Sequence, residues 1–136
     1  MAVVKELLRS EGKEALSFGD YTLETKAKVE DFSFNGDVYK VKTFHEITKL
    51  EKNGLFSYES VPGTAVNNFK ETTEGVTFIV EGSEDAQITL GLEENTVYKV
   101  YVGGEEAGEM ETNMGGKLSL SVELQGAGEV EVRVVK

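Results

Sequence analysis

Apolar and polar side chains alternate along much of this chain, and this alternation restricts its fold more than any other feature. Leu118, Leu120, Val122 and Leu124 alternate with polar residues, and the run from 130 to 134 repeats the pattern. Successive side chains of a β-strand point to opposite faces, so such runs predict strands with one buried and one solvated face. We therefore expect an all-β protein, built as an antiparallel β-sandwich.

The N-terminal half is predicted to contain six strands separated by turn residues. Asn35-Gly36 and Asn53-Gly54 lie between alternating segments, which is the strongest short-range signal for a hairpin. Residues 3–10 have an apolar spacing that also suits one helix face, but so short a helix is marginal and we favour a strand. The expected strands are 3–10, 15–18, 26–34, 37–44, 46–52 and 55–60. Pro62 cannot donate to a strand ladder, so Val61-Pro62-Gly63-Thr64 predicts a turn.

The C-terminal part is more regular and is expected to form five or six strands in a meander from Gly75 onward. Gly103-Gly104 predicts one hairpin turn, and the segment 125–128 predicts another. A length of 136 residues suits one domain. We divide it into an N-terminal strand region, 1–74, and a C-terminal sandwich region, 75–136, which either form sub-domains or share one core.

Composition narrows the functional classes. The chain has no cysteine, which excludes disulfides, thiolate metal sites and cysteine nucleophiles. No signal peptide or stretch of about 20 apolar residues is visible, so we expect a cytoplasmic protein without membrane contact. The net charge is −11. Residues 1–74 carry 13 acidic and 10 basic side chains, and residues 75–136 carry 12 and 4. This acidity disfavours nucleic-acid binding, because phosphate backbones are attracted by clustered Lys and Arg.

The segment from Ile88 to Val102 resembles the corner between two strands of fibronectin type III and related immunoglobulin-like domains. Leu92, Thr96 and Tyr98 have the offsets of that corner, and alternating valines follow. The resemblance implies that the leucine fills the core while the tyrosine hydroxyl bonds to nearby backbone. Glu94 stands where that family often has proline. A sandwich is implied, but no activity.

As a whole, the chain resembles a group of short bacterial proteins labelled "endosialidase". Gly19-Asp20-Tyr21, residues 39–43, residues 50–54 and residues 58–64 carry the resemblance. Sialidases hold the substrate carboxylate with three arginines, whereas this chain contains only Arg9 and Arg133. At 136 residues it is also too short for a six-bladed propeller of about 40 residues per blade. If this group of proteins is related to phage tail proteins, the resemblance therefore implies a folding, assembly or structural part of the tail and not its hydrolase.

Residues with chemical potential lack the patterns that catalysis requires. His45 is the only histidine, and Glu46, its neighbour on a strand, points to the opposite face. Adjacent carboxylates lie beside turns, where they usually serve solubility; they are Glu30-Asp31, Glu84-Asp85, Glu93-Glu94 and Glu105-Glu106. Tyr39, Tyr58 and Tyr101 are candidates for a platform that faces a ligand such as a sugar ring.

These observations favour a non-catalytic structural protein that self-associates through strand edges or a sheet face. We expect a homo-oligomer that needs no cofactor and no metal. The alternative is a module that binds a carbohydrate or a protein partner through exposed tyrosines. A phage-tail accessory role is a further alternative.

Overall fold

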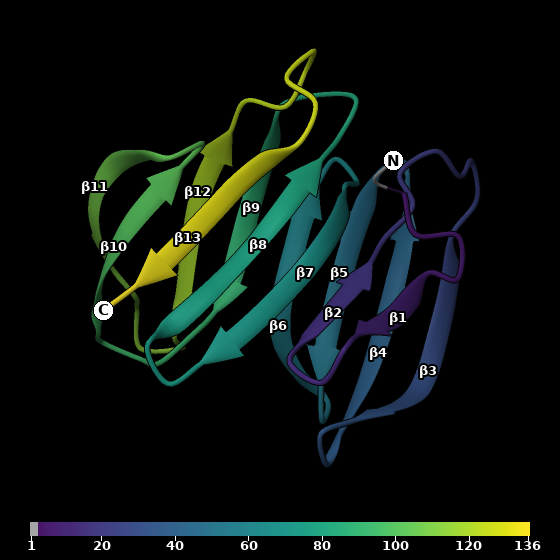
Figure 1. Ribbon diagram of the computed structural model, residues 1–136, viewed down its shortest axis with the longest axis horizontal. Coiled ribbons are helices and arrows are strands. Elements are labelled where there is room, and N and C mark those ends of the chain that lie inside the picture. Colours follow the sequence, from purple (N-terminus) through teal and green to yellow (C-terminus); the bar gives the residue numbers. More distant parts are fainter. Residues whose placement is uncertain (1–2) are drawn as a thin grey trace.

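The computed structural model describes residues 3–136, which form two antiparallel β-sheets packed face to face (Figure 1). The first sheet contains, in spatial order, β1 (Leu8–Glu11), β2 (Ala15–Phe18), β7 (Ala65–Thr72), β8 (Gly75–Glu81), β13 (Val130–Val135), β10 (Val97–Val102) and β11 (Glu105–Glu111). The second sheet contains β12 (Lys117–Val122), β9 (Ala86–Gly91), β6 (Leu55–Val61), β5 (Ile47–Lys52), β4 (Asp37–Phe44) and β3 (Ala27–Phe34). The expected all-β sandwich is confirmed.

Both halves of the sequence contribute to both sheets. β7 pairs with β8 in the seven-stranded sheet, and β6 pairs with β9 in the six-stranded sheet. In each case a strand from residues 1–74 is hydrogen-bonded to one from residues 75–136. The buried apolar side chains form one continuous cluster. The two regions distinguished in the sequence therefore share a core.

Several strands and turns lie where the alternation places them. β2 and β4 have the predicted bounds, and β3, β5 and β6 differ from prediction by one residue at one end. The two Asn-Gly pairs form the turns of the β3–β4 and β5–β6 hairpins. Asn35 and Asn53 both have a φ of 53°, in the left-handed region that Asn tolerates.

Two predictions for the N-terminal half are wrong. The first strand begins at Leu8 instead of Val3, because the chain turns at residues 5–6 and Leu7 has a φ of 71°. β7 was not expected at all. A bulge between Asn67 and Lys70 interrupts its alternation, so that Val66 and Phe69, three residues apart, are both buried.

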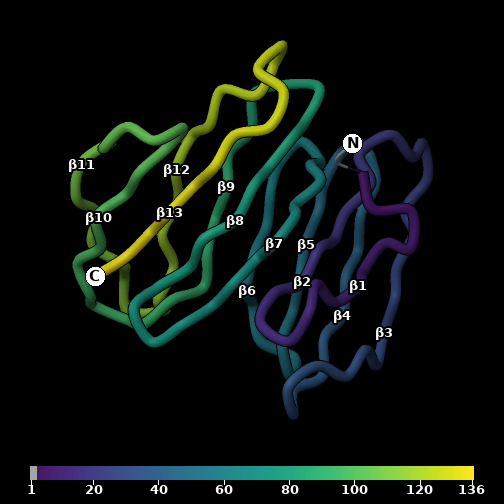
Figure 2. The backbone as a smooth tube through the Cα atoms, viewed as in Figure 1, coloured from purple at the N-terminus to yellow at the C-terminus, as the bar shows by residue number. Residues whose placement is uncertain are grey.

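The expected C-terminal meander is also wrong. The chain passes from one sheet to the other between β8 and β9, between β9 and β10, between β11 and β12, and between β12 and β13 (Figure 2). The segment 125–128 therefore joins strands of different sheets and is no hairpin turn. Only β10 and β11 form a hairpin in this region, across Gly103-Gly104. Alternation identifies strands but does not say which strands pair.

Four aromatic rings occupy the centre of the interface between the sheets. Phe18, Phe69 and Phe78 come from the seven-stranded sheet, and Tyr58 comes from the six-stranded sheet. The Tyr58 ring lies 5.2 Å from that of Phe18 and 5.7 Å from that of Phe78, centroid to centroid, in edge-to-face contacts. Each such pair contributes about 0.5–1.5 kcal/mol beyond the burial of its area.

The connection from β6 to β7 passes from one sheet to the other and brings a polar residue into the core. Thr64 is fully buried, and its hydroxyl lies 2.8 Å from both the Tyr58 hydroxyl and the Ser60 hydroxyl. The Thr48 hydroxyl donates to the Thr64 carbonyl at 2.8 Å and accepts from the Thr64 amide at 3.1 Å. Because the Thr48 hydroxyl proton is already donated to the Thr64 carbonyl, the Thr43 hydroxyl must be the donor in its contact with the Thr48 hydroxyl. No buried side-chain donor or acceptor of residues 3–136 lacks a partner.

We predict that Gly63→Ala destabilises the protein by about 1–3 kcal/mol. A Cβ at position 63 would lie 2.0 Å from the Phe44 carbonyl oxygen, so the crossing segment would have to move away from β4. Gly115→Ala is the control, since its Cβ would meet nothing closer than the Asn113 side-chain oxygen at 3.4 Å. Urea unfolding measures both, and equal losses would contradict the packing argument.

Candidate functional site

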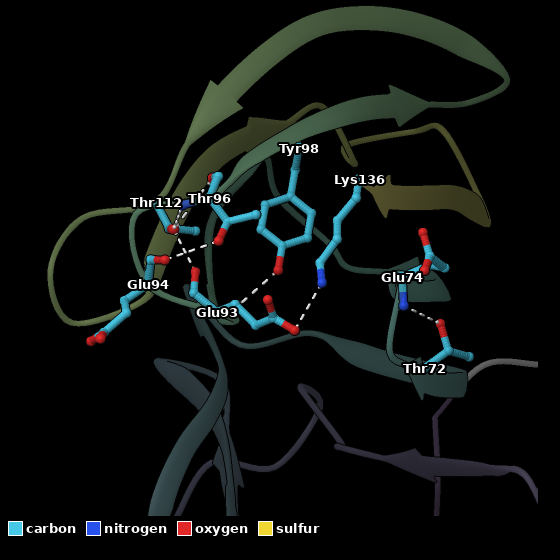
Figure 3. Close-up of polar contacts among 8 residues, drawn as sticks. All are labelled: Thr72, Glu74, Glu93, Glu94, Thr96, Tyr98, Thr112 and Lys136. Carbon is cyan, nitrogen blue, oxygen red and sulfur yellow. Dashed lines mark hydrogen bonds and ion pairs between the residues drawn. The ribbon is translucent and has the colours of Figure 1, made fainter.

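The segment before β10 forms a compact corner around Tyr98 (Figure 3). Tyr98 is 1% exposed, and its hydroxyl accepts a hydrogen bond of 3.2 Å from the Glu93 amide, five residues earlier. Leu92 is half-buried and packs against the core. The Thr96 hydroxyl donates to the Glu94 carbonyl at 2.9 Å. The three corner residues singled out in the sequence thus lie on one tight connection between the sheets.

Thr112 completes this corner, although the sequence did not single it out. It is buried at the end of β11, where its hydroxyl accepts from the Thr96 amide at 2.9 Å and donates to the Glu93 carbonyl. The Lys136 ammonium also contacts this corner, through an ion pair of 2.9 Å with the Glu93 carboxylate (Figure 3). These contacts hold the backbone of the corner in place.

The three tyrosines proposed as a ligand platform do not form one. Tyr58 is 0% exposed at the centre of the core, and Tyr39 is 4% exposed because it shares the inward face of β4 with Val41. Only Tyr101 reaches the surface, where the Arg133 guanidinium lies 4.4 Å from its ring centroid. The prediction of ligand-facing rings is therefore wrong for Tyr39 and Tyr58.

The remaining residues considered for catalysis are not brought together. His45 is exposed at the turn between β4 and β5, with its ring edge-on to Phe44 at 5.1 Å. Tyr58 points away from it into the core, where its hydroxyl contacts Thr64. Within residues 3–136, no three His, Asp or Glu side chains are close enough to hold a metal ion.

One end of the sandwich is hollowed by an open cleft of about 510 Å³. Its apolar lining comes from Leu55, Phe56 and Leu92, and the Lys117 ammonium lies 4.7 Å from the centroid of the Phe56 ring. Lys52 and Glu71 also line the cleft, and Lys52 is paired at 3.7 Å with Glu71 and at 3.7 Å with Asp37. The cleft thus combines apolar surface with a largely neutralised ion cluster.

Burial governs the protonation of two groups beside this cleft. The side chain of Glu71 is 26% exposed, and burial raises its pKa although Lys52 acts in the opposite direction. Burial also raises the pKa of Tyr39 to about 12, with smaller contributions from the charges of Glu71 and Asp37. Among the cleft residues Glu71 is the single acid, and the single hydroxyl side chain, Ser57, is 4% exposed.

Three of the four sheet edges carry features that discourage pairing with another chain. β1 has only 4 residues. β3 is bulged between Val29 and Phe32, and two acidic residues occupy the bulge. β11 carries four glutamates and is bulged opposite the step from Val100 to Tyr101. Short length, bulges and charge are the usual protections of an edge strand.

The fourth edge, β12, has no bulge, and its one charged residue is Lys117 at its start. It pairs regularly over 6 residues with β9 alone. The Leu92 amide bonds to the Gly116 carbonyl, and both backbone groups of Lys117 bond to Asn113 on the opposite side. Along an antiparallel strand, the N–H and C=O groups of successive residues point alternately to one neighbour and to the other. The backbone groups of Ser119 and Ser121 therefore point away from β9, as those of Lys117 do. Both residues are exposed.

Comparison with known proteins adds no relative. The chain matches no protein-family model, no curated protein and no solved structure. Residues 3–136 form no helix that could cross a membrane.

We predict that Tyr98→Phe lowers the free energy of unfolding by about 1 kcal/mol, because the Glu93 amide loses its acceptor. Tyr101→Phe is the matched control. It keeps the ring that faces Arg133 and removes a hydroxyl that forms no hydrogen bond within residues 3–136, so the change should stay within about 0.5 kcal/mol. Thermal and urea unfolding would contradict the corner's role if both variants behaved alike.

We predict that Glu71→Gln changes how stability depends on pH. The pKa of Glu71 in the folded protein lies above its ordinary value of 4.5, so the folded state binds the Glu71 proton more tightly than the unfolded state does. The stability that this proton gives is fully present below pH 4.5 and is lost as the pH rises through the folded pKa. The wild type should therefore lose stability relative to Glu71→Gln as pH rises above 4.5, until the folded pKa of Glu71 has been passed.

Glu74→Gln, a charge removal on the exposed β7–β8 turn, is the control for this titration. Unfolding free energies across that pH range measure the effect. A difference between the wild type and Glu71→Gln that stays constant with pH would contradict the assignment.

Proposed function

We propose that this chain is a non-catalytic structural protein that self-associates by pairing the β12 strands of two copies. The observation that supports this most is the free edge of β12, where the backbone groups of Ser119 and Ser121 have no partner in the sheet. An exposed, regular edge strand is a template for a further strand. Pairing of two copies would join their six-stranded sheets into one.

The sequence of β12 is compatible with antiparallel self-pairing. With a two-fold axis at Leu120, Ser119 of each copy lies opposite Ser121 of the other, and the two residues exchange two backbone hydrogen bonds. The two-fold axis produces this pair of residues twice, once on each side of Leu120, so the two copies exchange four backbone hydrogen bonds in total. The outward side chains at the centre are small and uncharged. Lys117 lies towards one end of this face and Glu123 towards the other, so each copy brings opposite charges towards its partner.

The expected association is weak. Each backbone hydrogen bond contributes about 0.5–1.5 kcal/mol net, and loss of rotational and translational freedom opposes the total. Four such bonds give at most about 6 kcal/mol before that loss, whereas a micromolar complex needs about 8 kcal/mol. We therefore expect a dissociation constant in the millimolar range. The alternative of a glycan-binding module has less support, because two of its three proposed aromatic residues are buried.

We predict that Ser119→Pro raises the dissociation constant of the dimer at least tenfold. The Ser119 amide points away from β9, so proline removes no bond of the existing sheet but removes a donor from the free edge. Thr89→Ala is the matched control. It removes the hydroxyl contact of 2.9 Å between Thr89 and Ser119 and leaves the backbone edge intact.

Sedimentation equilibrium measures the wild type and both variants. The proposal predicts dimers for the wild type and for Thr89→Ala. A wild type that stays monomeric at about 2 mM would refute it, because a millimolar dissociation constant would place a large share of the chains in dimers at that concentration.

A further inference from the structure

Three lysines stand side by side on the outer face of the six-stranded sheet. Lys28 of β3 is the cross-strand partner of Lys42 of β4, which is in turn the partner of Lys49 of β5. Adjacent strands lie about 4.8 Å apart, so the row spans about 10 Å. We call Lys28, Lys42 and Lys49 the lysine row. It lies in a chain whose net charge is −11.

The lysine row is costly for the isolated molecule, because like charges directly opposite each other destabilise a sheet. Its outer members are partly neutralised along their own strands. Lys28 lies 3.8 Å from Glu30, and Lys49 lies 3.6 Å from Glu51. Lys42, at the centre, forms no ion pair within residues 3–136 and faces a lysine on each side. The row therefore has an uncompensated positive centre.

The opposite end of the molecule presents the complementary charge. β11 is the edge strand of the seven-stranded sheet, and it lies at one end of the long axis while β3 lies at the other (Figure 1). Four exposed glutamates of β11 form no ion pair with any other described residue; they are Glu105, Glu106, Glu109 and Glu111. Glu106 pairs in register with Tyr101, and Glu109 with Lys99, so both point outward with those residues.

We propose that the lysine row of one copy binds the β11 glutamates of a second copy. The two surfaces differ, so the contact is head-to-tail. Such a contact leaves one free surface of each kind at the ends of every assembly, and growth continues as an open chain or closes as a ring. Each contact is an exposed set of charge pairs and is therefore sensitive to salt.

A second copy of this chain suits the lysine row better than a nucleic acid does. The surrounding protein is strongly acidic, and its field repels an extended polyanion that must follow the surface beyond three lysines. β11 presents its four glutamates within 7 residues of an edge strand instead. The row therefore meets a compact group of carboxylates and not a continuous line of phosphates.

This inference extends the proposed self-association but uses different surfaces. Pairing through β12 relies mainly on backbone hydrogen bonds, which depend less on salt than side-chain charge pairs do. The head-to-tail contact relies on side-chain charges and weakens as salt rises. The two contacts can therefore fail independently, and the test below is made where β12 pairing is blocked.

The experiment compares three proteins that all carry Ser119→Pro. The parent keeps both charged surfaces. One variant carries Lys28→Gln, Lys42→Gln and Lys49→Gln, and the other carries Glu106→Gln, Glu109→Gln and Glu111→Gln. At about 20 mM salt the parent should form oligomers larger than dimers, and each variant alone should be monomeric. An equimolar mixture should form 1:1 dimers only, because each variant retains the surface that the other has lost.

Mass photometry and sedimentation velocity distinguish these outcomes, and raising salt to about 300 mM should weaken the parent's association at least tenfold. The proposal is overturned if the parent is monomeric at low salt, if the lysine variant still oligomerises, or if the mixture forms no dimer. Thermal unfolding establishes that each protein is folded. If Ser119→Pro does not fold, the same set in a Ser121→Lys background tests the same contact.

Discussion

The sandwich depends on the place where the chain leaves one sheet and enters the other between β6 and β7. Thr64 lies fully buried there, and it satisfies its own polar groups by bonding to Thr48 and to the hydroxyls of Tyr58 and Ser60. Unpaired polar groups at this depth cost about 1–3 kcal/mol each, so the network must form as a unit. It locks β5, β6 and β7 together, and the pairing of β7 with β8 and of β6 with β9 then adds the C-terminal strands to both sheets.

Local pattern predicted the pieces of this fold better than their arrangement. The alternation and the two Asn-Gly turns are local signals, and the strands from β2 to β6 lie where those signals place them. β7 escaped notice because its bulge at Asn68 puts Val66 and Phe69 on the same face and breaks the two-residue period. The meander failed for another reason, because the connections after β8, β9, β11 and β12 cross between sheets and contact partners distant in sequence.

In the candidate sites, too, contacts within one segment could be predicted from the sequence, whereas contacts between distant segments could not. Tyr98 and Glu93 are five residues apart, so their contact belongs to a segment that the sequence can describe. Tyr39 could have been recognised as buried, because Lys40 and Lys42 mark the opposite face of β4 as solvated. The lysine row could not have been predicted by extending the strand register from the Asn35-Gly36 turn along β3 and β4. Without a bulge, that turn would pair Lys28 with Thr43, an inward residue.

The bulge in β3 therefore has two consequences that sequence alone conceals. Near the turn, Phe34 pairs with Asp37 and Phe32 with Tyr39, whereas beyond the bulge Val29 pairs with Val41, one residue out of step. Asp31, with a φ of 58°, absorbs the extra residue and interrupts the edge ladder, which protects β3 from pairing with another strand. The same shift carries Lys28 to the outer face beside Lys42. One backbone irregularity thus closes this edge to strand addition and creates a charged surface next to it, so an approaching chain meets side-chain charge and not a free ladder.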